Sequence, residues 1–128
     1  MYKHDYAAAI EDFSEAIQID ANNAMAYCNR GYAWSIQDSF DKAVSDFNEA
    51  LRIEPKDADA LEWRGFAWTK MGMFDKALTD YTEAIRLAPS KSSAYVSRGY
   101  AWTMVGDFKV AVQCAQREAL VAFCVRRI

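Results

Sequence analysis

The chain repeats itself with a period of 34 residues, and this repetition constrains its fold more than any other feature. The stretch 24–57 is followed by a second copy over 58–91, and a third copy opens at Ser92. An Arg-Gly pair returns at the same phase in each copy, as Arg30-Gly31, Arg64-Gly65 and Arg98-Gly99. Self-similarity of this length is typical of proteins built from stacked repeats.

Each copy has the pattern of two amphipathic helices. In 24–57 the apolar residues recur every three to four positions, which predicts helices over about 24–37 and 39–53. Asn23 is a suitable N-cap for the first of them. Pro55 and Pro89 end the second helices, because proline disfavours helical geometry in the residue before it.

A glycine stands near the centre of each first helix, where it costs about 1 kcal/mol relative to alanine. The same phase is kept by Gly31, Gly65 and Gly99. We therefore expect a side chain of the second helix to approach the backbone of the first helix at these positions.

These residues resemble the pattern of the tetratricopeptide repeat family. That pattern has an aromatic residue, Gly and a second aromatic residue in the first helix, then Ala, an aromatic residue, Ala and Pro in the second. The copy 24–57 holds at these places Tyr27, Gly31, Trp34, Ala43, Phe47, Ala50 and Pro55. The copy 58–91 holds Leu61, Gly65, Trp68, Ala77, Tyr81, Ala84 and Pro89. The resemblance implies an all-α fold, a right-handed superhelical solenoid of antiparallel helix pairs.

The two ends of the chain depart from a complete repeat. Residues 1–23 match only the second half of the unit, and the third copy loses the pattern after Val112. We expect a fragment that begins with the second helix of a truncated repeat (1–23), continues with two repeats (24–57 and 58–91) and closes with a degenerate last repeat and an extended C-terminal helix (92–128). A capping helix or an altered sequence at a truncated end would explain the last segment equally well. The arginine before each glycine replaces the family's usual Leu, which we interpret as an Arg-Gly subtype.

Charge and composition disfavour several classes of protein. Fifteen basic and eighteen acidic side chains give a net charge of −3 without a basic cluster, which argues against nucleic-acid binding. No apolar run is long enough to cross a membrane, and Met1 does not open a secretory signal. The three cysteines, Cys28, Cys114 and Cys124, have no metal-binding spacing. Free thiols of this kind favour a cytoplasmic location.

The sequence contains no catalytic pattern. His4 is the only histidine and has no paired nucleophile, and the cysteines have no neighbouring basic cluster to lower their pKa. Carboxylates such as Asp41 and Asp75 fall in the first turns of helices, where they suit the helix dipole. We expect no enzymatic activity, no metal and no cofactor.

Each first helix carries a second stripe of side chains that faces away from its partner helix. Tyr32 lies about 200° from Trp34 around the helix, and Phe66 and Tyr100 keep its phase. In the tetratricopeptide repeat family the first helices line a concave wall that binds partner peptides. The resemblance implies such a groove here, with the residues Tyr32, Phe66, Tyr100, Cys28, Glu62, Val96, Thr69 and Lys70, joined by Ser35 and Thr103. The alternative is that these rings fill packing gaps between repeats.

Some members of the family hold the C-terminal carboxylate of chaperone tails with Lys, Asn and Arg side chains. The matching positions here are Cys28, Tyr32, Trp63, Ser93 and Ser97. None of them offers the cationic or amide donors that an anionic tail requires. Binding of chaperone tails is therefore disfavoured.

The expected function is protein–protein interaction, in which the groove binds a peptide or helix of a partner protein. The alternative is a structural module that self-associates through its terminal helices. Tyr6, Ile10, Phe13 and Ile17 lack the helix that would normally cover them, and the segment 119–125 is apolar.

The repeated arginines lie on the largely buried side of the first helices, so each requires an acidic or carbonyl partner. Acids recur at Asp12, Asp46 and Asp80, and Cys114 takes that place in the third copy. Pairing every arginine with the preceding repeat leaves none unmatched. The sequence therefore predicts ion pairs between repeats, namely Asp12–Arg30, Asp46–Arg64 and Asp80–Arg98.

Overall fold

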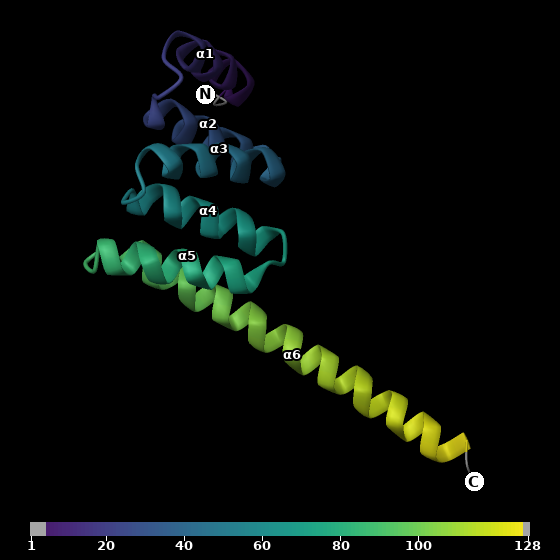
Figure 1. Ribbon diagram of the computed structural model, residues 1–128. Coiled ribbons are helices and arrows are strands. Elements are labelled where there is room, and N and C mark those ends of the chain that lie inside the picture. The colour runs from purple at the N-terminus through teal and green to yellow at the C-terminus, as the bar shows by residue number, and fades with distance from the viewer. Residues whose placement is uncertain (1–4, 127–128) are drawn as a thin grey trace.

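The computed structural model describes the backbone of residues 5–126 and the side chains of residues 5–109, 112, 113 and 116. Regular structure in this part of the chain consists of six helices, which stack in chain order (Figure 1). They are α1 (Tyr6–Ile19), α2 (Ala24–Ile36), α3 (Phe40–Ile53), α4 (Ala58–Lys70), α5 (Phe74–Leu87) and α6 (Ser92–Arg126). The predicted all-α solenoid is confirmed. Among the helices described, none has the length and apolar character that a bilayer crossing requires.

Short, well-defined connections set the bounds of the helices. The side chains of Asp5, Asn23 and Asp57 cap α1, α2 and α4 by accepting hydrogen bonds from backbone N–H groups of the first turn. The predicted cap at Asn23 is therefore confirmed. The two turns within the helix pairs contain Asp38 and Gly72, with φ angles of 60° and 78°. Glycine adopts this left-handed region without steric cost.

Within each complete pair, the glycine of the first helix faces the buried ring of the second. Phe47 and Tyr81 are the largest fully buried side chains described, with 0% and 1% of their surface exposed. A Cβ atom placed at Gly31 would lie 2.9 Å from the Phe47 ring, and one at Gly65 would lie 2.8 Å from the Tyr81 ring. The close approach predicted from the glycine phase is confirmed for the pairs α2–α3 and α4–α5.

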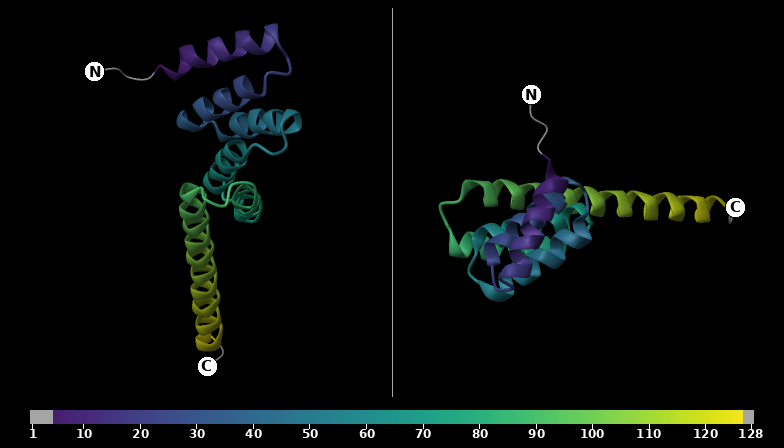
Figure 2. Two further views of the ribbon diagram at one scale, coloured as in Figure 1. Left: turned by 90° about the vertical axis from the view of Figure 1, so that its left-hand side faces the viewer. Right: turned by 90° about the horizontal axis from the view of Figure 1, so that it is seen from above.

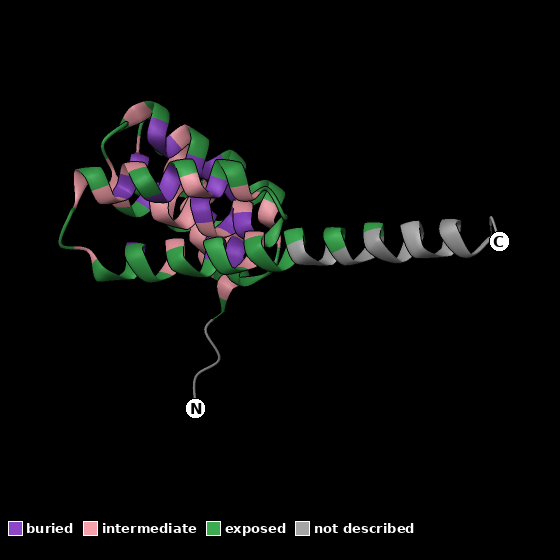
Figure 3. Cartoon of the chain, turned by 90° about the horizontal axis from the view of Figure 1, so that it is seen from below, coloured by how far each residue is buried: buried purple, intermediate pink, exposed green. Residues whose placement is uncertain are grey.

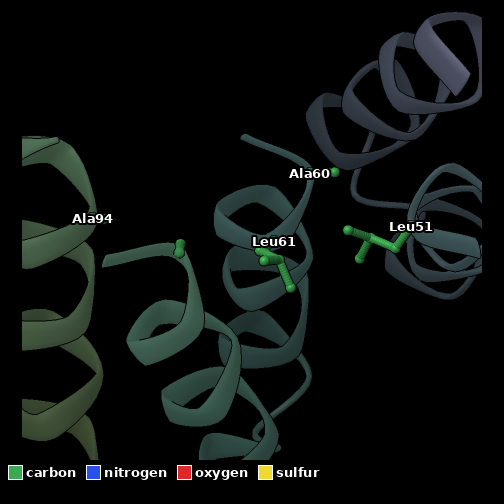
Figure 4. Close-up of a cluster of buried hydrophobic side chains, with 5 residues drawn as sticks. Leu51, Ala60, Leu61 and Ala94 are labelled. Atoms are coloured by element: carbon green, nitrogen blue, oxygen red, sulfur yellow. The ribbon is translucent and has the colours of Figure 1, made fainter. Parts of the chain in front are cut away.

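Small and aliphatic side chains fill the space between successive pairs. Leu51 of α3, Leu61 of α4 and Ala94 of α6 belong to one buried cluster together with two further alanines (Figure 4). Figure 3 shows the buried residues concentrated where helices face each other, with exposed residues on the outside. The described buried residues form clusters that each combine side chains from neighbouring pairs, so every pair shares its core with the next.

The helix α6 does not turn where the third copy would turn. Gly106 lies 34 residues after Gly72, but α6 runs on, and its second half extends away from the stack (Figure 2). A Cβ at Gly99 would meet no atom within 4 Å, because no second helix lies over it. The residue at the phase of Phe47 and Tyr81 is Ala115. Alanine supplies no ring to pack against Gly99, so folding the chain back at this point would bury little apolar surface.

The arginines pair within their own repeats. Arg30 donates two hydrogen bonds to the Asp46 carboxylate at 2.7 and 2.8 Å, and Arg64 binds Asp80 in the same way with two bonds of 2.7 Å. The predicted ion pairs between repeats are therefore wrong. The two helices of a pair pack antiparallel at the glycine. This places the aspartate 16 residues after the arginine next to it, where the planar guanidinium can donate two hydrogen bonds.

The third nitrogen of each guanidinium still contacts the preceding repeat. Nη1 of Arg30 donates to Ser14 at 3.1 Å, and Nη1 of Arg64 donates to Asn48 at 2.9 Å. Nη1 of Arg98 makes a longer contact of 3.5 Å with Thr82. Arg30 and Arg64 thus link two repeats, but through a hydrogen bond to an uncharged side chain where an ion pair is predicted.

Candidate functional site: the wall of first helices

Two neighbouring hollows lie along the wall formed by α2, α4 and the first half of α6. The α2–α4 hollow has a volume of about 590 Å³ and is lined by Met25, Cys28, Asn29, Tyr32, Glu54, Asp57, Asp59 and Trp63. The α4–α6 hollow has a volume of about 320 Å³ and is lined by Phe66, Thr69, Lys70, Tyr81, Val96, Ser97 and Tyr100. The helix period explains the lining residues that lie on the first helices, because it places their second stripe on this side.

The α2–α4 hollow combines an aromatic wall with an acidic rim. The rings of Tyr32 and Trp63 meet edge to face with centroids 4.4 Å apart. Glu54 begins the α3–α4 connection, Asp57 ends it as the N-cap of α4, and Asp59 lies in the first turn of α4. Such a surface can accept a long side chain whose apolar part packs on the rings and whose end carries a positive charge.

The acidic rim and partial burial act on the thiol of Cys28. Burial and, to a smaller extent, the negative charges of Asp57 and Asp59 together raise the pKa of Cys28 to about 12. The side chain is a neutral thiol at pH 7 and a poor nucleophile. It therefore contributes packing and shape to the hollow.

The α4–α6 hollow is more apolar. Val96 and Tyr100 are 72% and 52% exposed, so one side of the hollow is open to solvent. The ammonium group of Lys70 lies 5.5 Å from the centroid of the Phe66 ring. Thr69 forms part of the buried floor, where its hydroxyl donates to the carbonyl of Gly65 at 2.9 Å.

A chain of aromatic contacts connects the two hollows. Trp63 contacts Phe66 with centroids 5.8 Å apart, and Phe66 contacts Phe40 of α3 at 6.3 Å. Tyr32, Trp63 and Phe66 are half-buried. The rings therefore pack between repeats and also line the hollows.

The predicted groove residues divide between the hollows. Cys28 and Tyr32 line the first, whereas the second holds Phe66, Thr69, Lys70, Val96 and Tyr100. Glu62 belongs to neither lining. It is half-buried and lies 3.3 Å from the ammonium of Lys91, with the Ser93 hydroxyl donating to it at 3.3 Å.

Sequence reasoning missed the acids that come from outside the helical stripe. Glu54 and Asp57 lie in the connection between repeats, where no 3.6-residue period applies. The N-cap pattern at Asp57 was the available signal, because a cap must stand beside the start of α4. Ser35, expected beside the groove, is 2% exposed and donates to the Gly31 carbonyl, whereas Thr103 is exposed.

Several residues discussed in the sequence analysis lie outside the part of the chain that the structure describes. They are His4 and the side chains of Cys114, Cys124 and the segment 119–125. Within the described residues, no group of His, Cys, Asp and Glu side chains is arranged to hold a metal ion.

The sequence matches two family descriptions. "Tetratricopeptide repeat" matches residues 24–57 and 58–91, more than half of the chain, and "TPR repeat" matches residues 1–34. Human small glutamine-rich tetratricopeptide repeat-containing protein beta is 49% identical over 35 residues. That match spans 27% of this chain but only 12% of the relative.

Two solved structures of similar fold cover most of the chain. The Arabidopsis OM64 TPR domain has a TM-score of 0.73 at 29% identity, over 75% of this chain and 79% of that one. The second TPR domain of the human RPAP3 protein, solved in complex with the HSP70 peptide SGPTIEEVD, has a TM-score of 0.73 at 26% identity. It covers 75% of this chain and 80% of that domain.

Proposed function

The chain belongs to the tetratricopeptide repeat family, and we propose on that basis that it is a protein-interaction module whose wall of α2, α4 and α6 binds a peptide or helix of a partner protein. The observation that carries the proposal is the pair of adjoining hollows, which are lined by aromatic and aliphatic side chains on preformed helices. Rigid walls of this kind bind without a large ordering cost.

The partner segment combines apolar and basic residues. An aromatic or aliphatic side chain enters the α4–α6 hollow beside Phe66 and Tyr100. A Lys or Arg enters the α2–α4 hollow, where Glu54 and Asp57 supply negative charge and Tyr32 and Trp63 supply ring faces.

The same charges oppose an acidic tail. The similar domain of RPAP3 binds a peptide that ends in Glu-Glu-Val-Asp, but the wall here presents carboxylates at Glu54 and Asp57. Bringing like charges together at an interface costs several kcal/mol. The proposal is therefore a non-catalytic module for partners other than acidic chaperone tails.

Peptide display tests this proposal. A random peptide library selected against the chain should yield binders enriched in Lys or Arg together with aromatic or branched apolar residues. Phe66→Ala should weaken their binding by about 2 kcal/mol or more, as expected for a central aromatic contact. Ile19→Ala removes an 81% exposed side chain at the end of α1 and serves as the matched control.

Two results would contradict the proposal. One is binding that is insensitive to Phe66→Ala while the variant loses thermal stability, which would make Phe66 a packing residue alone. The other is a library enriched in acidic sequences.

Self-association is a second candidate function, favoured by the bare side of α6. Tyr95 and Trp102 of α6 are 45% and 56% exposed, whereas Leu61, at the phase of Tyr95 in the preceding repeat, is 5% exposed. Two large aromatic side chains exposed beside a glycine form a surface suited to another helix.

A further inference from the structure

We propose that the first half of α6, residues 92–105, binds α1 of a second copy of this chain, and that the two helices together form a composite repeat. The inference rests on the second proposed function, self-association, and does not involve the hollows of the wall. Three features of the two helices match each other in register.

The first feature is an unfilled space at a glycine of α6, Gly99, which we call the glycine notch. In the complete pairs, Gly31 receives the ring of Phe47 and Gly65 receives the ring of Tyr81. Gly99 stands at the same phase, and a Cβ there would meet no atom within 4 Å. The flanking rings of Tyr95 and Trp102 are exposed for the same reason. This side of α6 has the features of a first helix without its second helix.

The second feature is a ring on α1 at the phase that fits the notch. Phe13 lies 34 residues before Phe47 and 68 before Tyr81. Those two rings are 0% and 1% exposed, whereas Phe13 is only half-buried. The helix α1 thus has the features of a second helix whose ring has no glycine to meet among the described residues.

The third feature is a pair of complementary charges. Arg30 binds Asp46 and Arg64 binds Asp80, in each case 16 residues apart. Arg98 makes no ion pair with a described residue, and its hydrogen bond to Thr82 is 3.5 Å long. Asp12, at the phase of Asp46, is exposed and makes no described ion pair. If Phe13 of one copy enters the notch at Gly99 of another, Asp12 reaches Arg98 in the arrangement of the other two pairs.

The chain's own C-terminal segment is less suited than α1 of a second copy to pack against this side of α6. At the phases of the acid and the ring, the third copy holds Cys114 and Ala115. A fold-back at Gly106 would therefore give Arg98 no carboxylate and Gly99 no ring. Because α1 and α6 lie at opposite ends of the stack (Figure 1), α1 reaches this surface only from a second copy.

The contact is heterologous, since each copy offers a different surface at each end. It extends the order of the repeats from one chain into the next, and repetition gives a linear assembly or a closed ring. Dimers formed about a two-fold axis would require another interface.

Filling the notch tests the ring contact. Sedimentation over a concentration series should show association of the wild-type chain. Gly99→Leu should weaken it about tenfold or more, because leucine occupies the space of Phe13. The monomer tolerates this change, since the position is open. The matched control is Gly106→Ala, which removes a glycine from the same helix outside the contact and should leave association unchanged.

Charge reversal tests the register. Arg98→Asp alone and Asp12→Arg alone each place like charges in the contact and should weaken association about thirtyfold or more. An equimolar mixture of the two variants should associate as the wild type does, because each contact then joins opposite charges.

Each possible outcome of these experiments either supports or overturns the composite repeat. A chain that remains monomeric at all concentrations overturns the proposal, as does association that is unaffected by Gly99→Leu or not restored in the mixture. Loss of association with Gly106→Ala would point to an intramolecular turn at that position and would also overturn it. Peptide binding by these variants reports the groove separately, so failure of the composite repeat leaves that function intact.

Discussion

In each of the two complete repeats, one guanidinium connects three helices. Arg64 of α4 holds Asp80 of α5 with two short hydrogen bonds and reaches Asn48 of α3 with its remaining nitrogen. Asp80 is 4% exposed, so loss of the Arg64 contact would leave a buried carboxyl group without its hydrogen-bond partner. This arginine therefore links the two helices of its own pair and connects them to the preceding pair.

Removing the Asp80 carboxylate should show how much its ion pair with Arg64 contributes to stability. We expect Asp80→Ala to lower the free energy of unfolding by about 2 to 3 kcal/mol, because it leaves Arg64 partly buried without its carboxylate. Denaturant unfolding followed by circular dichroism gives this value. Glu83→Ala breaks the exposed pair of Glu83 with Arg86 and should cause no measurable change. Equal effects of the two substitutions would contradict the role given to Arg64.

The thiol of Cys28 offers a residue-scale test of the acidic rim. Its pKa of about 12 predicts slow alkylation at pH 8 in the folded chain and faster alkylation after unfolding, where the ordinary value is 9.0. Asp57→Asn keeps the helix cap, removes one of the charges that raise the pKa, and should accelerate alkylation of the folded chain. Mass spectrometry of the peptide that contains Cys28 separates it from the other cysteines. Unchanged reactivity in the variant would contradict an acidic field at this hollow.

The same pKa has a consequence for stability. The folded thiol ionises at higher pH than the unfolded one, so its contribution is fully present below about pH 9 and is lost as pH rises from there toward 12. Near neutral pH the thiol is protonated in both the folded and the unfolded chain, so this group adds no pH dependence of stability there.

At the scale of the helix, three glycines at one phase have two different roles. Gly31 and Gly65 permit the contact with Phe47 and Tyr81, whereas Gly99 faces open space. Sequence alone could not separate them, because the difference lies in the partner helix. Where that helix carries a ring, the chain turns and the ring is buried. Where it carries Ala115, α6 continues.

Alanine substitution should reveal the two roles. We expect Gly65→Ala to destabilise the chain by about 1 to 3 kcal/mol, since its Cβ would lie 2.8 Å from the buried Tyr81 ring. Gly99→Ala should instead stabilise α6 by about 1 kcal/mol through helix propensity. Thermal unfolding at concentrations below association measures both. The same sign for both substitutions would contradict the difference between the two sites.

Much of the helical architecture could be predicted from the sequence. The period of the apolar residues, the cap at Asn23 and the prolines place α2 and α3 within a residue or two of their bounds. The pairing of the arginines could not be predicted by counting charges. That argument required every charge to find a partner within the chain, whereas the structure leaves Arg98 and Asp12 without ion pairs among the described residues.

At the scale of the whole molecule, the stack turns the first helices toward one wall and places the second helices behind them. The period of the helices is enough to expect Tyr32, Phe66 and Tyr100 on that wall. It does not reveal the acids contributed by the connection before α4 or the contact of Trp63 with Tyr32, because both depend on how one repeat is seated on the next. The partner chemistry that we propose therefore depends on how the repeats stack more than on the aromatic stripe of the first helices.

Hydrogen exchange of the chain with and without a display-selected peptide tests the proposed binding wall most directly. Below the concentration of self-association, we expect added peptide to slow exchange in α4 and in the adjoining parts of α2 and the first half of α6, with α1, α3 and α5 little changed. Protection confined to α3 and α5, or to α1, would place the partner on another face of the stack and contradict the account.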